Sequence, residues 1–265
     1  MNNLDNFDKF SFSRFMMLAK REIISSKNIF LMELAVVAGL IIIAEFFISW
    51  SALPSLNDVK EYPSCYYSDS TCVSIIFVLG IWGFAFLANI AASLVCLKLS
   101  NKKGRITTFM TVGTQGEKYL LNFLIYDVFF VLYFFTVWLL VDLVRVIYVD
   151  MVYPFEGKWV LFYAIDQWNW MVALGTIALF LFSQAFYTLV SAFSPKLAFL
   201  KAFGLSYAVG FLLIPYSFFC SVVLIDKSFS GESNVIVIMA SSVMIIYAIA
   251  MQLLAYYRYK ETDII

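Results

Sequence analysis

The chain has 265 residues, of which 63% are hydrophobic and only 14% are charged, and its mean hydropathy is +0.87. Soluble domains carry about 25% charged residues, so this composition excludes an ordinary water-soluble fold and indicates a protein that lies within a membrane. Eighteen acidic residues balance eighteen basic ones, and a zero net charge produces no overall field that would attract nucleic acid.

The first 28 residues are polar and charged, and they lack the apolar core and small-residue cleavage site of a secretory signal. Within them, apolar and basic residues recur at helical spacing: Phe7, Phe10, Arg14, Met17, Leu18 and Arg21. This pattern predicts a short amphipathic helix that lies in the membrane surface ahead of the first span. The alternative is a basic arm without structure that only sets the orientation of the chain.

Six apolar segments are each longer than the roughly 20 residues that a helix needs to cross the hydrocarbon core. They lie at 29–50, 73–98, 119–141, 169–191, 202–225 and 234–257. The sequence therefore predicts an all-α integral membrane protein. It would be a single domain, 1–265, with six transmembrane helices preceded by the interfacial helix of the 1–28 arm.

The basic residues alternate between the segments that connect these spans. Fourteen of the eighteen Lys and Arg residues lie in the N-terminal arm, in the loops after the second and fourth spans, and in the C-terminal tail. Because cytoplasmic loops retain Lys and Arg, both termini are predicted to be cytoplasmic. Many of the aromatic residues lie near span ends, which is the level at which they contact lipid headgroups.

The loops predicted to face outward are short and acidic. Cys65 and Cys72 lie in the loop 51–72 and would face an oxidising compartment, so a small disulfide-closed loop is one prediction, and two unpaired thiols are the other. The segment 142–168 is the longest predicted external loop, and its stretch 144–152 has the composition of a segment resting on the membrane surface.

Motifs for catalysis are missing from the sequence. There is no histidine, which removes imidazole metal ligands and histidine-based acid–base chemistry. There is also no G-x-x-x-x-G-K-[ST] phosphate loop, no CxxC pair and no paired-carboxylate motif. We therefore expect no enzyme activity, no catalytic residue, no metal site and no cofactor in this chain. Energy for any work would come from a partner or from an ion gradient.

Two carboxylates lie inside predicted spans, Glu45 in the first and Asp127 in the third, with no Lys or Arg expected at matching depth. A buried carboxylate is costly unless it is paired, hydrated or protonated. Three interpretations remain: a proton- or cation-coupled site, a polar lining of a translocation path or subunit interface, and ordinary hydrogen bonding between helices. Asn89, Ser183 and Gln184 offer polar partners on neighbouring spans.

The loop between the second and third spans is the most distinctive segment. It begins with basic residues and continues with Ile106, Phe109 and Met110, whose spacing places them on one face of a short helix. Such a helix would present an apolar surface with charged flanks to a cytoplasmic partner, and Gly113 and Gly116 predict a turn after it. The alternative is a basic connector that binds lipid headgroups.

This loop carries a resemblance to a known family. Residues 103–110 (KGRITTFM) and 117–120 (EKYL) are similar to the K-x-R-I-x-x-L-M-L-P-A-S-x-x-E-K-F-L run of bacterial ABC-2 type permeases, and 199–201 (FLK) also fits their pattern. The resemblance covers about 90–205. Where the family has Pro-Ala-Ser, this chain has VGTQ at 112–115.

The resemblance implies a multi-pass subunit of an exporter in the bacterial inner membrane. A second permease chain, identical or different, would complete the pathway, and two cytoplasmic P-loop ATPase subunits would bind ATP and Mg²⁺ and power it. The family's coupling surface would correspond to Arg105, Ile106, Phe109, Met110, Glu117 and Lys118.

Two other interpretations stay open. A membrane scaffold or immunity-type protein that transports nothing would need only a protein partner and would tolerate changes at Glu45 and Asp127. An ion-coupled carrier would need those carboxylates, although the two halves of the chain show no internal repeat of the kind common in such carriers.

Overall fold

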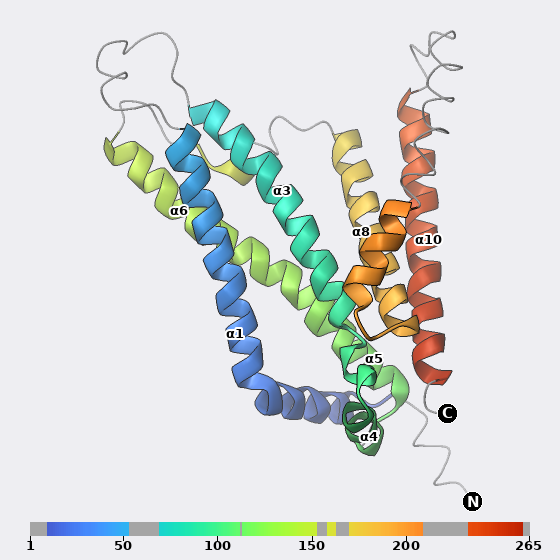
Figure 1. The fold of residues 1–265 in the computed structure, drawn as a ribbon. Coiled ribbons are helices and arrows are strands. Elements are labelled where there is room, and N and C mark those ends of the chain that lie inside the picture. Colours follow the sequence, from blue (N-terminus) through green and yellow to red (C-terminus); the bar gives the residue numbers. More distant parts are fainter. Residues whose placement is uncertain are drawn as a thin grey trace, which may run out of the picture. The chain divides into compact units, whose positions relative to one another are not determined.

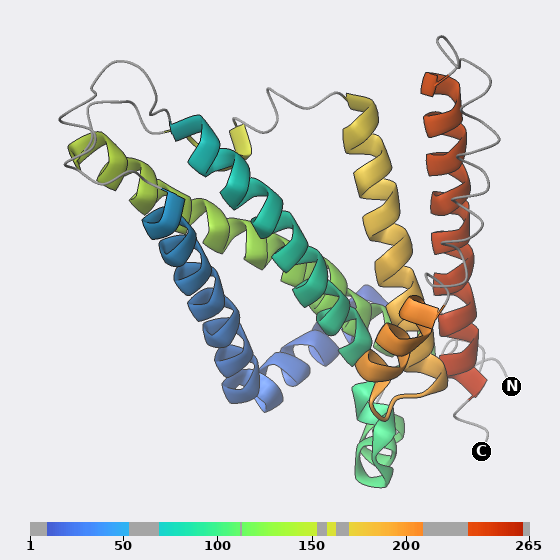
Figure 2. The ribbon, with the colours of Figure 1, turned by 45° about the horizontal axis from the view of Figure 1, so that its top comes forward.

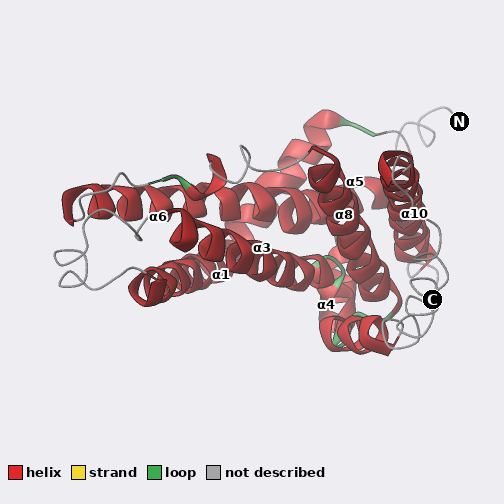
Figure 3. Cartoon of the chain, turned by 90° about the horizontal axis from the view of Figure 1, so that it is seen from above, coloured by secondary structure: helices red, strands yellow, loops and turns green. Residues whose placement is uncertain are grey.

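The computed structural model describes residues 10–52, 69–111, 113–152, 158–162, 170–208 and 233–261. Within these ranges every regular element is a helix and no strand occurs (Figure 3). The elements in chain order are α1 (Phe12–Ala52), α3 (Asp69–Leu94), the 3₁₀ helix η1 (Leu97–Ser100), α4 (Lys102–Met110), α5 (Gln115–Phe123), the π-helix η2 (Leu124–Phe129), α6 (Phe130–Val152), α8 (Trp170–Phe193) and α10 (Ser233–Glu261). Residues 198–208 also form a helix.

Five helical stretches in the described part of the chain are long and apolar enough to cross a membrane. They are Leu31–Trp50, Val73–Leu94, Gln115–Val152, Ala173–Phe193 and Ile238–Glu261. These stretches coincide with five of the six predicted spans and mark the chain as a multi-pass membrane protein. The remaining predicted span, 202–225, begins in the helix 198–208, and its other residues lie outside the described part.

The helix that contains the third predicted span, 119–141, continues beyond it. Residues 142–152, at the start of the predicted external segment 142–168, are also helical and belong to α6. The charged side chains of Asp142 and Arg145 neutralise each other inside the fold, which removes the reason to end the helix at them.

The predicted helix in the N-terminal arm is confirmed from Phe12 onward, but it is not a separate short element. It continues into the apolar stretch Leu31–Trp50 as the single helix α1. Figure 1 shows that α1 bends before the apolar stretch begins.

Contacts divide the chain into two compact units. The first unit comprises Met1–Ala19, Ala88–Val128 and Asn169–Ile265, and the second comprises Lys20–Leu87 and Phe129–Trp168. In the first unit, α8 and α10 pack along each other, as Figures 1 and 2 both show. Its main core cluster consists of Val95, Cys96, Leu99, Tyr119, Ala192, Ala255 and Tyr259.

In the second unit, aromatic side chains join α3 to α6. The rings of Phe84 and Phe134 lie 4.9 Å apart, and Phe134 meets Trp138 edge-on at 5.9 Å. The Tyr133 hydroxyl donates a hydrogen bond of 2.7 Å to the carbonyl oxygen of Leu34 on α1. Aromatic packing therefore holds α3 against α6, and a hydrogen bond ties α6 to α1.

Gly80 is required by this packing, because a methyl group at its position would overlap the indole ring of Trp138. The ring is only 3% exposed and is packed against two phenylalanines, so it has little room to move. We expect Gly80→Ala to lower the free energy of unfolding by about 1–3 kcal/mol, the usual cost of overpacking. Thermal unfolding of the detergent-solubilised protein measures the effect.

Gly83→Ala is the matched control on the same helix, because no atom lies within 4 Å of the added methyl group. Removing a glycine from a helix interior gains up to about 1 kcal/mol, so this variant should unfold at the same temperature as the parent or above it. Equal destabilisation by both variants would contradict the proposed contact.

Candidate functional site

The predicted helix in the loop between the second and third spans is confirmed as α4, Lys102–Met110. The side chain of Ile106 is 50% exposed and that of Met110 is 81% exposed, and Arg105 is also exposed. The side chain of Phe109 lies outside the described part of the chain. In the described residues, the exposed face of α4 thus combines apolar and basic side chains, as the spacing predicted.

The helix α4 packs closely against η1, the 3₁₀ helix that precedes it. At Gly104, an added methyl group would collide with the carbonyl oxygen of Lys98 in η1. A larger residue at this position would have to push α4 away from η1, so glycine fixes how closely the two helices approach.

The turn that follows α4 was predicted at two glycines, and one of them forms it. Gly113 has a φ of 150°, a conformation that favours glycine. Gly116 was wrongly assigned to this turn: it lies inside α5, where an added methyl group would contact the Tyr256 hydroxyl at 3.5 Å. This is an ordinary van der Waals distance, so the packing of α10 against α5 does not require glycine at this position.

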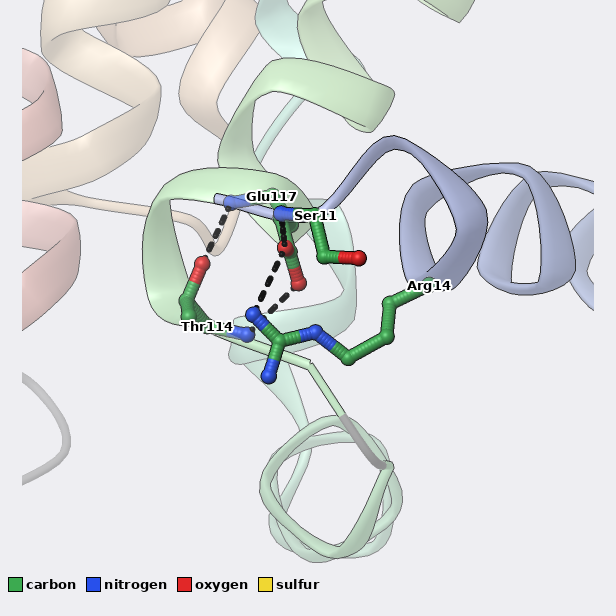
Figure 4. A network of polar contacts seen from close by, with 4 residues as sticks. All are labelled: Ser11, Arg14, Thr114 and Glu117. Atoms are coloured by element: carbon green, nitrogen blue, oxygen red, sulfur yellow. Dashed lines mark hydrogen bonds and ion pairs between the residues drawn. The ribbon is translucent and has the colours of Figure 1, made fainter. Parts of the chain in front are cut away.

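Glu117 forms a buried junction at the start of α5. Its backbone N–H donates to the Thr114 hydroxyl at 3.3 Å, and its carboxylate accepts the backbone N–H of Thr114 at 2.9 Å, which completes a capping box. The same carboxylate accepts the backbone N–H of Ser11 at 2.8 Å and pairs with Arg14 at 3.3 Å (Figure 4). One side chain therefore ties the N-terminal arm to the start of the third span.

Glu117 and Lys118 were predicted to orient a contact with a partner, and this role stays a prediction. Glu117 is 1% exposed and Lys118 is 5% exposed, so neither presents its side chain at the surface. The sequence signal for the true arrangement was Thr-x-x-Glu at 114–117, the capping-box pattern. Ser11 and Arg14, the partners of Glu117 in the N-terminal arm, have no local sequence pattern that predicts this contact.

A second buried ionic group lies in the second unit, around Arg145. The Arg145 Nε atom lies 2.8 Å from Asp142 Oδ1 and 3.9 Å from Glu45 Oε1. Arg145 also donates to the carbonyl oxygen of Lys158, and Asp142 Oδ2 accepts the backbone N–H of Val160 at 2.8 Å. The group joins α1, α6 and the segment 158–162.

The expectation that Glu45 lacks an ionic partner is therefore wrong. Arg145 lies in the segment 142–168, which the sequence predicts as an external loop away from the depth of Glu45. Asp142 and Arg145, spaced i,i+3 on a helix, are the signal that was missed. The ion pair with Arg145 is one contribution that opposes the cost of burying Glu45.

The predicted polar residues of the second and fourth spans meet in the first unit. The Ser183 hydroxyl lies 3.2 Å from Asn89 Oδ1. Farther along, the Ser191 hydroxyl donates to the carbonyl oxygen of Ser93 at 2.8 Å and accepts the backbone N–H of Cys96 at 3.2 Å. These bonds join α8 to the end of α3.

Asp127 and Gln184 belong to the same unit, but their side chains have fewer hydrogen-bond partners. Asp127 lies on η2 with 4% exposure, and neither of its carboxylate oxygens accepts a hydrogen bond from the described residues. Gln184, on α8, is also buried, and its side-chain nitrogen has no hydrogen-bond partner in the described part. Asp127 is thus a buried polar group without the donors that Glu117 has.

Cys96 lies directly after α3 and is 1% exposed. Its side chain belongs to the apolar core cluster of the first unit. The thiol therefore stays protonated at neutral pH and behaves as a small packing group. The predicted disulfide between Cys65 and Cys72 falls on side chains outside the described part.

No metal-binding group of three or more His, Cys, Asp or Glu side chains occurs in the described ranges. No family model, curated protein or solved structure matches the chain.

Proposed function

We propose that the chain is the membrane-spanning subunit of an ATP-driven exporter of the ABC-2 type. The observation that carries the proposal is α4, a short helix between α3 and the third span that exposes Ile106 and Met110 beside Arg105. An exposed apolar face on a short helix is a form that protein grooves bind. The similarity of residues 103–110 and 117–120 to ABC-2 permeases gives this surface its expected partner, a cytoplasmic P-loop ATPase.

The topology in this proposal has six spans, with the fifth at 202–225 and both termini in the cytoplasm of a bacterial cell. The distribution of Lys and Arg supports it, since fourteen of the eighteen lie in the segments placed inside. The loop that contains α4 then faces the compartment that supplies ATP.

The proposed mechanism uses α4 as the point at which the ATPase acts. ATP and Mg²⁺ bind to the ATPase subunits, and this chain contributes no catalytic residue. Movement of the ATPase displaces α4, and the turn at Gly113 passes the displacement to α5. Because Glu117 ties α5 to Ser11 and Arg14, the N-terminal arm moves with it. A second permease chain, identical or different, completes the pathway.

The test is co-purification of a tagged chain with its native partners in mild detergent. We expect Met110→Asp to weaken binding of the ATPase by about 2 kcal/mol or more, which is roughly a 30-fold loss, because a charge replaces an apolar contact in the groove. Ile106→Asp should weaken binding of the ATPase in the same way as Met110→Asp. Phe109→Asp tests the third predicted contact. Stoichiometric recovery of a nucleotide-binding subunit is the measurement.

Met151→Asp is the matched control, because Met151 is also 81% exposed but lies near the end of α6. It should retain the ATPase. If the parent chain carries no nucleotide-binding subunit, or if Met110→Asp retains it fully, the exporter proposal fails, and a scaffold or an ion-coupled carrier becomes the better interpretation.

A further inference from the structure

Asp127 occupies an unusual position in the first unit. It lies on η2, a π-helix that interrupts the third span between α5 and α6, and it is 4% exposed. Single π-helical turns inside α-helices occur frequently at functional sites, because the extra residue redirects a side chain. The proposed coupling through α4 assigns no role to this residue.

The surroundings of Asp127 differ from those of the other buried carboxylates in the described ranges. Glu117 and Asp142 accept backbone N–H groups and lie beside an arginine, and Glu45 lies 3.9 Å from Arg145. Asp127 accepts no hydrogen bond and takes part in no ion pair there. An ionised carboxylate in this environment would have neither a donor nor a counter-charge.

The nearest hydroxyl group has two acceptors competing for one proton. Thr188 on α8 interacts with Asp127, and its hydroxyl also lies 2.9 Å from the carbonyl oxygen of Gln184, to which it can donate. A hydroxyl has one proton and two acceptor lone pairs. While Thr188 donates to Gln184, it offers Asp127 only an acceptor, and a proton on the carboxyl group would complete that contact.

The titratable groups that face Asp127 from the neighbouring elements are neutral. After α3, the thiol of Cys96 stays protonated, and on α5 the Tyr119 hydroxyl donates to Gln252 Oε1 of α10 at 2.9 Å. On α10, Tyr259 packs against Tyr119, with ring centroids 5.5 Å apart. No lysine or arginine in the described part forms an ion pair with Asp127.

We propose that Asp127 is a proton-binding site within the membrane domain and holds a proton in the conformation described here. Among the described residues Asp127 belongs to no group of three or more His, Cys, Asp or Glu side chains that could hold a metal ion, so we assign a proton to the site. Release of the proton requires a conformation in which water or a donor reaches the carboxylate. The site goes beyond the exporter function and does not depend on it.

The test uses the complete wild-type protein in native membranes and an apolar carbodiimide, which adds to protonated carboxyl groups in apolar surroundings. Peptide mapping by mass spectrometry then gives the labelling rate at each carboxyl group. We expect Asp127 to label at pH 7, and its rate to fall by about tenfold per pH unit above the point at which the proton leaves. Glu117 and Asp142 in the same sample are the internal controls and should stay unlabelled.

A water-soluble carbodiimide provides the reverse comparison. It should label the exposed Asp150 and Glu261 and leave Asp127 unmodified. In infrared spectra, Asp127→Asn should remove the carbonyl-stretch band of one protonated carboxyl group. Labelling of Asp127 no faster than of Glu117 would overturn the proposal. Protection of Asp127 by Na⁺ or K⁺ at constant pH would also overturn it, because the site would then bind a metal cation.

Discussion

Arg145→Met should lower the free energy of unfolding by about 3–5 kcal/mol, the cost of leaving buried charges without their partner. Arg145 is the cation that lies beside both Glu45 and Asp142, and all three side chains are almost fully buried. Methionine fills a similar volume, so the loss reflects charge and hydrogen bonding more than an empty space. Thermal or denaturant unfolding in detergent, followed by loss of the folded peak in size-exclusion chromatography, measures it.

A second substitution separates the electrostatic effect from a packing effect. Arg145→Met leaves two buried carboxylates without their cation, and the double variant Glu45→Gln, Arg145→Met removes one of them. We therefore expect the free energy of unfolding of the double variant to exceed that of Arg145→Met by about 1 kcal/mol or more. Arg105→Met, at an exposed arginine of α4, should change stability by less than about 0.5 kcal/mol. If Arg145→Met behaved like Arg105→Met, the buried ionic group would have no part in stability.

Glu117→Ala should release the N-terminal arm and destabilise the protein by about 2–4 kcal/mol. It removes the capping box of α5, the acceptor for the Ser11 backbone N–H and the partner of Arg14. We expect trypsin to cleave after Arg14 in this variant under conditions in which the parent protein is resistant. The Arg14 side chain is only 20% exposed in the parent protein and would become accessible in the variant.

Glu261→Ala is the control, since Glu261 also pairs with an arginine, Arg258, but its side chain is 62% exposed. Exposed ion pairs contribute about 0–1 kcal/mol, so cleavage in the arm should not change. Glu117→Gln keeps an acceptor oxygen and should fall between the parent and Glu117→Ala. Unchanged resistance in Glu117→Ala would mean that other contacts hold the arm.

Hydropathy alone predicted most of the fold in the described residues. Five apolar segments coincide with five helices, because a run of about 20 apolar residues has few other stable arrangements. The helix α4 was equally predictable from the spacing of Ile106, Phe109 and Met110. These features depend on neighbouring residues, which a single sequence displays directly.

The errors concern contacts between distant residues. Arg145 was assigned to a loop because a charge ends an apolar run, and only the fold reveals that Glu45 and Asp142 lie beside it. The family resemblance placed Glu117 in the coupling surface and did not indicate its contacts with Ser11 and Arg14, which are more than a hundred positions away. Local sequence patterns contain no information about such distant partners. A charged residue whose counter-charge is unknown is therefore predicted to be exposed to solvent.

The junction at Glu117 also has a consequence for the order of events on the ribosome. Ser11 precedes Glu117 by 106 positions, so at about 5–20 residues per second the arm waits roughly 5–20 s for its binding partner to be made. During that interval α1 and α3 are synthesised while the amphipathic start of α1 has only the membrane surface to bind. Completion of residues 114–117 then allows the arm to bind, so its final placement is a late step of biogenesis although it is translated before α3 and α5.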